Sequence, residues 1–370
     1  MTLDSWGFQV ALGAVLLAVL ALGIWRWHRF RWRRSERFGV LVIVQLLVLL
    51  FGFNMVNISG QYFGDWNDLA GSGSVAATER MDRTDPPNAF SGDDNDWRVT
   101  AVERAVDRAR AAQSSLQVIT LPGAATDYRL PAEVYLPGSY AVDSHRRYPV
   151  IELQAGYPGS ARTWPNYLHL KSMLDTLIGN GSMPAVIAVS TTQNPRRGYD
   201  SECVDADPKQ VPGSLAETYL TVDVPAFIRA HYRAGAGRVD WIDGGFSTGG
   251  FCAANLVLRH PRSYAGAVVL SGYFEPIVDH STGPLYATAA ERAANNPSLL
   301  IRRKHPPTAF FLGAAQNNAD DMVALSAMQT RVPSSDPLRI VTTESGGHSG
   351  TTWRELVPTA FSWMAAVLAR

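Results

Sequence analysis

Seven consecutive residues, 244–250, contain the arrangement that a serine nucleophile requires. Their sequence is Gly-Gly-Phe-Ser-Thr-Gly-Gly, so Ser247 stands between Gly245 and Gly249 in a G-x-S-x-G pattern. A reactive hydroxyl has to stand clear of a sheet on a strained turn, and side chains two residues before and after it would crowd that turn. The spacing therefore predicts that Ser247 attacks a carbonyl carbon and forms an acyl-serine.

The residues on both sides of this turn agree with that prediction. Residues 238–243 are typical of a short buried strand, and residues 251–259 are apolar at helical spacing. Other glycine-rich turns have different requirements. A dinucleotide-binding turn needs glycines at offsets zero, two and five, and a phosphate-binding loop needs Lys after its last glycine. The sequence has neither, so the strand–turn–helix context favours a nucleophile.

A base and an acid are expected downstream of the nucleophile. In the α/β-hydrolase arrangement the chain order is Ser, acid, His, each at the end of a strand. Three strand-like runs follow the predicted nucleophile helix, at 266–271, 308–313 and 338–343. His348 lies in a loop of small residues just beyond the last of them. We therefore predict His348 as the general base.

The acid has more than one candidate. Asp320 and Asp321 follow the strand predicted at 308–313 and precede a helical run from 322 to 331. Adjacent residues point in different directions, so one aspartate is expected to orient the imidazole and the other to cap the helix. We predict Asp320 as the catalytic acid, with Asp321 as the alternative. Glu275, just past the strand at 266–271, is the outside candidate.

Two backbone amides are expected to form the oxyanion hole. The first belongs to Thr248, directly after the nucleophile. The second is expected in the loop that follows an earlier strand. Residues 148–153 are typical of a strand and lead into the glycine-containing loop 154–160, in which the Tyr157 N–H is our candidate donor.

Together these segments resemble a known family. Residues 134–137, the loop 154–160 with Trp164 beyond it, residues 245–250, and the histidine loop 347–349 with Trp353 beyond it resemble the esterase family of α/β-hydrolases. That family includes esterase D-like enzymes, enterochelin esterases and the antigen 85 mycolyltransferases. The resemblance covers roughly residues 114–370. It implies an α/β-hydrolase fold, with a mostly parallel central sheet and helices on both faces. It also implies a triad of Ser247, His348 and a carboxylate near Asp320. The spacing from Gly313 to Asp320 is long for the esterase branch of the family and nearer the antigen 85 pattern.

Two apolar runs near the N-terminus predict a transmembrane helical hairpin. They span about 8–27 and 38–58, and each is about long enough to cross a hydrocarbon core. Six arginines lie between residues 26 and 37, which the positive-inside rule places in the cytoplasm. Residues 1–4 carry no positive charge, which disfavours a cleaved signal peptide. We therefore predict a multi-pass protein of the cell membrane, with an extracytoplasmic catalytic domain.

The predicted organisation has three parts. Residues 1–59 form the membrane anchor, residues 60–113 form a juxtamembrane linker with a short helix over 102–113, and residues 114–370 form the catalytic domain. Cys203 and Cys252 both belong to the outward part. In an oxidising compartment they are candidates for a disulfide, and two buried thiols are the alternative.

Composition excludes several functions. The chain has 33 basic and 33 acidic residues, and no basic stripe outside the arginine-rich turn indicates nucleic-acid binding. The sequence has no metal-binding motif, so we predict neither a metal nor another cofactor. The predicted function is a serine esterase or acyltransferase, in which an ester or acyl donor, such as an acyl-sugar or lipid of the cell envelope, transfers its acyl group to water or to a sugar. The alternatives are a non-catalytic module that binds envelope glycans and a serine peptidase of the same fold.

Overall fold

The computed structural model describes residues 6–29, 34–60, 66, 76–83, 90, 95–196, 198–207, 209, 211 and 214–370. The chain forms two compact units. One comprises residues 1–75 together with 346–351, and the other comprises residues 76–345 together with 352–370.

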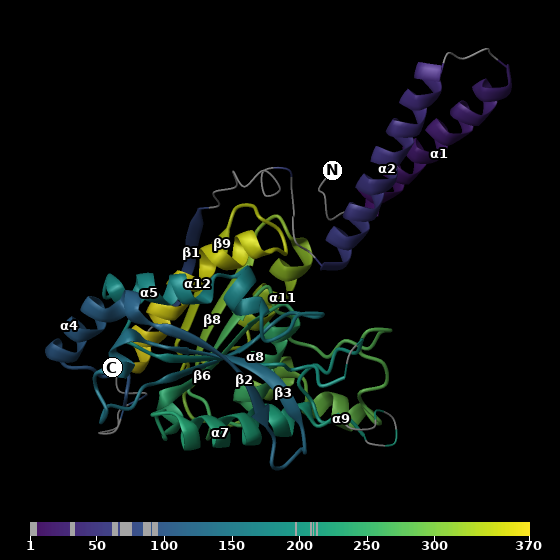
Figure 1. Ribbon diagram of the computed structural model, residues 1–370. Helices are drawn as coiled ribbons and strands as arrows, with labels where there is room; N and C mark the ends of the chain where they lie inside the picture. Colours follow the sequence, from purple (N-terminus) through teal and green to yellow (C-terminus); the bar gives the residue numbers. More distant parts are fainter. Residues whose placement is uncertain are drawn as a thin grey trace. The chain divides into compact units, whose positions relative to one another are not determined.

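The larger unit is built on one nine-stranded sheet (Figure 1). Its strands are β1 (Ala77–Arg83), β2 (Ser115–Pro122), β3 (Arg129–Leu136), β4 (Val150–Gln154), β5 (Ile187–Ser190), β6 (Trp241–Phe246), β7 (Gly266–Leu270), β8 (Ala309–Ala315) and β9 (Leu338–Thr343). They lie in the order β1-β9-β8-β7-β6-β4-β5-β3-β2. The six strands β4 to β9 run parallel, while β1, β2 and β3 pair antiparallel at the two margins.

The central strands are buried on both faces. Every residue of β4, β6, β7 and β8 is buried, as expected of parallel strands that are covered by helices on both sides. The carboxyl ends of parallel strands meet at one edge of a sheet, so the segments that follow β4, β6, β7 and β8 begin at the same edge. The α/β-hydrolase fold expected from the sequence is confirmed.

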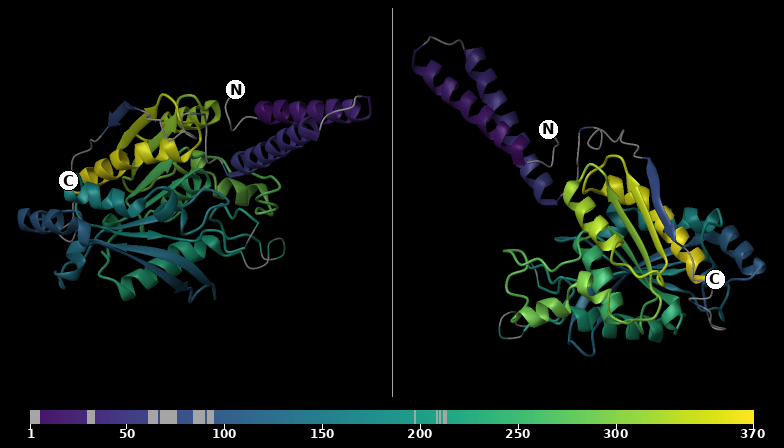
Figure 2. Two further views of the ribbon diagram at one scale, coloured as in Figure 1. Left: turned by 45° about the horizontal axis from the view of Figure 1, so that its top comes forward. Right: turned by 180° about the vertical axis from the view of Figure 1, so that it is seen from behind.

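Helices cover both faces of this sheet. The helices of the larger unit are α4 (Ala101–Arg110), α5 (Leu170–Gly179), α6 (Ala216–Thr218), α7 (Val224–His231), α8 (Thr248–Arg259), α9 (Ala289–Ala294), α10 (Pro297–Leu300), α11 (Ala319–Gln329) and α12 (Gly350–Leu368), whose first two residues belong to the other unit. Helices α5 and α12 lie on one face of the sheet, and α7 lies on the opposite face (Figures 1 and 2).

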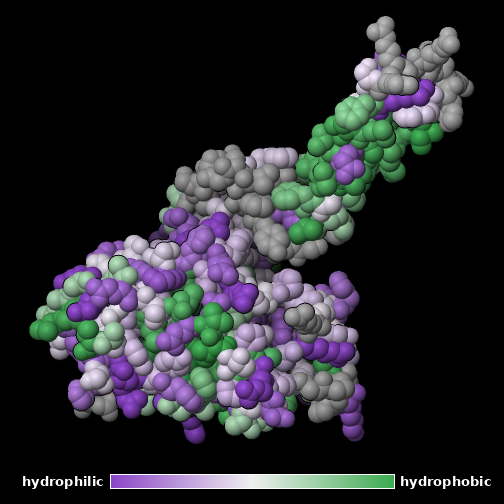
Figure 3. Space-filling view, in the orientation of Figure 1, coloured by the Kyte–Doolittle hydropathy of each residue, from purple (hydrophilic) through white to green (hydrophobic). Residues whose placement is uncertain are grey.

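The N-terminal segment forms two long apolar helices. Helix α1 spans Trp6–Arg29 and helix α2 spans Arg34–Gly60. Within them, Gly7–Trp27 and Ser35–Asn57 are long and apolar enough to cross a membrane. Apolar side chains cover the outer surface of the pair (Figure 3). Between the helices Asn54 donates to Gln9 Oε1 at 2.8 Å, and Gln9 donates to Phe51 O at 3.4 Å.

The segment predicted as a linker is more ordered than the sequence indicated. Residues 77–83 form β1, which pairs antiparallel with β9 at the margin of the sheet. The helix expected over 102–113 is present as α4, and a capping box between Thr100 and Glu103 fixes its start. The described residues between 76 and 113 therefore belong to the unit that contains the sheet.

Candidate active site

Ser247 occupies the sharp turn between β6 and α8. Its φ is 57° and its ψ is −125°, in the left-handed half of the map that residues with a side chain rarely adopt. Backbone hydrogen bonds hold this conformation: the Ser247 N–H donates to Leu270 O of β7 at 2.9 Å, and Ser247 O accepts the N–H groups of Gly250 at 2.9 Å and Phe251 at 3.1 Å. The strand–turn–helix arrangement predicted from the sequence is confirmed.

The two glycines of the motif are required by close backbone contacts. A Cβ on Gly245 would lie 2.1 Å from Gly249 O. A Cβ on Gly249 would lie 2.3 Å from Gln154 O, at the end of β4. The backbones of β6, α8 and the end of β4 thus approach each other closely around the nucleophile turn.

The loop after β4 lies against Ser247. A Cβ on Gly156 would lie 2.9 Å from the Ser247 Cβ and 3.0 Å from the Phe246 ring. Tyr157, the predicted second oxyanion donor, follows directly and is half-buried. The loop is held from behind by Trp164, whose Nε1 donates to Gln154 O at 2.9 Å. The segment that carries Tyr157 is therefore adjacent to the nucleophile turn.

Aromatic rings support the residue before the nucleophile. Phe246 stacks on Trp353 of α12 with ring centroids 4.1 Å apart, and it contacts Trp164 at 5.7 Å. The second turn of α12 is thereby fixed beside the end of β6.

The predicted base lies in the loop between β9 and α12. His348 is partly buried, and Gly346 and Gly347 before it both have positive φ. The loop closes on itself where Ser349 Oγ donates to Gly346 O at 2.6 Å. Two glycines with left-handed backbone therefore shape the loop that carries His348.

The three acid candidates differ in burial. Asp320 and Glu275 are exposed, while Asp321 is buried and lines a small gap with Ser271 and Gly313, at the ends of β7 and β8. Asn318 caps α11, because its side chain accepts the Asp321 N–H at 3.0 Å. The expectation that an aspartate caps this helix is therefore wrong. Because α11 begins at this cap, Asp320 faces solvent and Asp321 faces the interior. Asp321 is therefore a better candidate for the catalytic acid than Asp320.

The two cysteines are joined, as the sequence suggested. The Cys203–Cys252 disulfide ties the segment after β5 to α8, with a Cα–Cα distance of 5.4 Å. Just before Cys203 lie two buried carboxyls that the sequence analysis did not single out, Asp200 and Glu202. Burial raises the pKa of Asp200 to about 6 and that of Glu202 to about 7. Only their contacts in the folded structure identify these two carboxyls as candidate functional groups.

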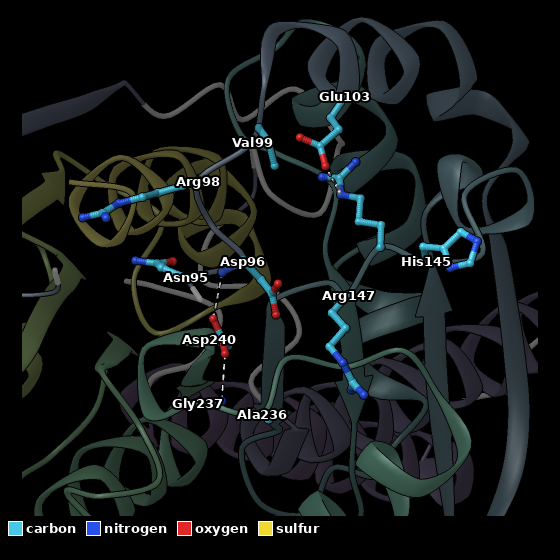
Figure 4. A pocket seen from close by; sticks show the side chains of 11 residues that line it. Asn95, Asp96, Arg98, Val99, Glu103, His145, Arg147, Ala236, Gly237 and Asp240 are labelled. Atoms are coloured by element: carbon cyan, nitrogen blue, oxygen red, sulfur yellow. Dashed lines mark hydrogen bonds and ion pairs between the residues drawn. The ribbon is translucent and has the colours of Figure 1, made fainter. Parts of the chain in front are cut away.

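A second cavity lies at the opposite edge of the sheet. It has a volume of about 620 Å³, and residues 145–147 and 236–240, which precede β4 and β6, line it together with residues 95–103 (Figure 4). Two of its charged side chains have partners: Arg146 binds Asp107 at 2.7 Å and lies 3.8 Å from Glu103, and Asp240 accepts the backbone N–H of Asp96 at 2.9 Å. It contains none of the predicted catalytic residues.

Comparison with known proteins assigns most of the chain to a family. A family model described as "Putative esterase" matches residues 123–364. An uncharacterised protein of Corynebacterium glutamicum is 28% identical over 247 residues, which are 63% of this chain. The chain spans 56% of the length of that relative.

Solved structures share the fold. The chain is similar to a ferulic acid esterase (20% identity, TM-score 0.56, 69% of this chain and 99% of that one). It is also similar to an S-formylglutathione hydrolase of Agrobacterium tumefaciens (17% identity, TM-score 0.58, 69% and 96%). A third similar structure is MPT51 of Mycobacterium tuberculosis (13% identity, TM-score 0.53, 69% and 99%). At these identities the likeness shows the fold alone.

Proposed function

Because the chain belongs to the esterase family, we propose that it is a serine esterase or acyltransferase in which Ser247 attacks the carbonyl carbon of a carboxylic ester. One observation carries this proposal. Ser247 has a φ of 57° on the turn from β6 to α8, where it begins a helix and stands at the carboxyl edge of the sheet. A strained turn of this kind exposes a serine hydroxyl to substrate and has no evident structural purpose.

His348 is the proposed general base. Its loop begins just beyond the carboxyl end of β9, at the edge where the nucleophile turn follows β6. Trp353, five residues later in the chain, stacks on Phe246 next to the nucleophile, which supports a base contributed from this segment. Asp321 is the proposed acid, since its carboxyl is buried near the ends of β7 and β8. It would accept the Nδ1–H of the imidazole and stabilise the imidazolium.

The backbone N–H groups of Thr248 and Tyr157 are the proposed oxyanion donors. Thr248 is the first residue of α8, where the N–H groups of the opening turn have no partner within the helix and the helix dipole favours negative charge. The Tyr157 segment is placed against Ser247 by the close approach of Gly156.

The reaction proceeds in two steps. The Ser247 Oγ bonds to the carbonyl carbon while His348 takes its proton, and the two amides stabilise the oxyanion. The tetrahedral intermediate collapses, and the departing alkoxide receives that proton from His348. Water, or the hydroxyl of a sugar acceptor, then attacks the acyl-serine with His348 again as base, which releases Ser247.

The site is proposed to face the outside of the cell, tethered by α1 and α2. The arginines between the two apolar helices favour a cytoplasmic turn, which puts both ends of the hairpin outside. The Cys203–Cys252 disulfide supports this orientation, because disulfides persist in oxidising compartments. Envelope lipids and acyl-sugars are the substrates within reach of such a site.

Ester hydrolysis by the full-length protein in detergent tests the proposal. We expect turnover of p-nitrophenyl esters, with a rate that depends on acyl chain length, and loss of turnover in Ser247→Ala. A peptidase would hydrolyse peptide anilides at a comparable rate. Unaltered protein that binds envelope glycans and turns over neither substrate would instead be a binding module.

A further inference from the structure

The segment that follows β5 contacts both proposed sources of oxyanion donors. We call residues 193–203 the brace loop; all of them except Arg197 are described. At one end Gln193 lies beside the loop that carries Tyr157, and at the other Asp200 lies beside Thr248. Both Gln193 and Asp200 are buried.

The contact with Thr248 is a buried hydrogen bond. The Thr248 hydroxyl donates to Asp200 Oδ2 at 2.7 Å, and the Thr248 side chain is itself buried. A hydrogen bond to an ionised carboxylate is among the stronger ones in proteins, and burial removes competition from water. It fixes the side chain of the residue whose backbone N–H is the proposed donor.

The contact on the other side reaches the Tyr157 loop. Gln193 donates its amide N–H to Ala155 O, two residues before Tyr157. Because this acceptor lies on the backbone, the hydrogen bond restrains the path of the chain from the end of β4 into the loop.

Hydrogen bonds within the brace loop connect these two contacts. Ser201 Oγ donates to Gln193 O at 2.7 Å, and the Glu202 N–H donates to Asp200 Oδ1 at 3.1 Å, so the two ends are joined internally. The Cys203–Cys252 disulfide then ties the loop covalently to α8. Cys252 is four residues after Thr248, on the same face of the helix, so the loop holds two successive turns of α8.

A further segment is fastened to the same loop. Glu202 accepts hydrogen bonds from Tyr273 OH at 2.9 Å, the Ile277 N–H at 2.9 Å and Tyr286 OH at 2.6 Å. The Asp200 N–H donates to Ser281 O at 2.8 Å. The brace loop is therefore held from its outer side as well and cannot move independently of residues 273–286.

We propose that Gln193 and Asp200 are positioning residues that hold the two oxyanion donors at a fixed separation. This inference rests on the proposed function. The two donors lie in different elements, one in the loop after β4 and the other at the start of α8. The strained backbone of Ser247 does not by itself fix the distance between the two donors. The brace loop reaches both, so it sets the geometry that stabilises charge in the transition state.

Two variants test the proposal from opposite ends of the loop. Thr248→Val keeps the shape of the side chain and removes the hydroxyl that donates to Asp200. Gln193→Met keeps the length of the side chain and removes the donor to Ala155. The matched control is Thr192→Val, the same change on the neighbouring residue, whose hydroxyl donates away from the site to Pro131 O at 2.8 Å.

The assay is ester hydrolysis by the full-length protein in detergent. Since misplacing a donor is less severe than deleting it, we expect kcat to fall about 10- to 100-fold in Thr248→Val and Gln193→Met, with KM within about twofold. Inhibition by a trifluoromethyl ketone, which forms a tetrahedral oxyanion adduct, should weaken in proportion to kcat/KM. Thr248→Ser should recover most of the loss, and Thr192→Val should leave kcat unchanged.

The outcomes separate the two proposals. If both variants fold and keep the kcat of the unaltered protein, or if Thr192→Val loses as much activity as they do, the positioning role is refuted while the esterase proposal stands. If the unaltered protein neither hydrolyses esters nor reacts with a fluorophosphonate, the proposed function falls and the positioning role falls with it.

Discussion

Gly156 offers a steric test of the proposed oxyanion geometry. Its φ is not in the left-handed region, so alanine can adopt the backbone, and the effect of Gly156→Ala comes from the added methyl group alone. That Cβ would lie 2.9 Å from the Ser247 Cβ and 3.0 Å from the Phe246 ring. Carbon atoms pack at about 3.5–4.0 Å, so the loop has to retreat from the nucleophile by roughly 1 Å.

A displacement of that size has a calculable consequence. A misplacement of about 1 Å lowers the rate roughly 100-fold, which corresponds to about 2.7 kcal/mol of transition-state stabilisation. We therefore expect kcat/KM for a short p-nitrophenyl ester, measured well below the melting temperature of the variant, to fall by about that factor.

Gly179→Ala is the matched control. Its added Cβ would meet the Ala111 Cβ at 3.4 Å, within ordinary contact distance, on α5 away from the site. We expect this variant to keep full activity. If Gly156→Ala stays within about threefold of Gly179→Ala, a change of only about 0.6 kcal/mol, the Tyr157 loop does not supply an oxyanion donor and the proposed geometry is refuted.

Three further predictions follow from the burial of individual groups. Asp321→Asn should lower kcat about 10³- to 10⁴-fold while Asp320→Asn leaves it nearly unchanged, and equal losses would argue against Asp321 as the acid. Replacing Cys203 and Cys252 with serine should lower the free energy of unfolding by up to about 4 kcal/mol, because the disulfide joins residues 49 positions apart in the sequence. Denaturant titration measures this change, and an unchanged unfolding midpoint would contradict the prediction. Burial raises the pKa of Glu152 to about 8, so between pH 4.5 and 8 the folded state retains a proton that the unfolded state loses. The free energy of unfolding should therefore fall as the pH rises through this range, by at most about 1.4 kcal/mol per pH unit. Melting temperatures across that range should decline less steeply in Glu152→Gln, and parallel profiles would count against this assignment.

Local sequence patterns predicted the structural features that depend on residues close together in the chain. Gly245 predicted the turn because a side chain there would meet Gly249, only four residues later in the chain. The buried strands β7 and β8 were predicted because parallel strands covered on both faces are near-continuous apolar runs.

The features that could not be predicted depend on residues far apart. β1 has the polar sequence Ala-Thr-Glu-Arg-Met-Asp-Arg and is mostly exposed, so only its pairing with β9 makes it a strand. The choice between Asp320 and Asp321 depends on the phase of α11, which Asn318 sets. The contacts of Gln193 and Asp200 cross from β5 to β4 and α8, and no spacing in the sequence indicates them.

The central claim is that Ser247 is an activated nucleophile, and covalent labelling tests it most directly. The full-length protein in detergent is treated with a fluorophosphonate, and the modified peptide is identified by mass spectrometry. We predict one adduct, on Ser247, that forms at least about 100-fold more slowly in His348→Ala, since general-base catalysis contributes about 10²- to 10⁴-fold. An unlabelled Ser247, or labelling at the same rate without His348, would contradict the account.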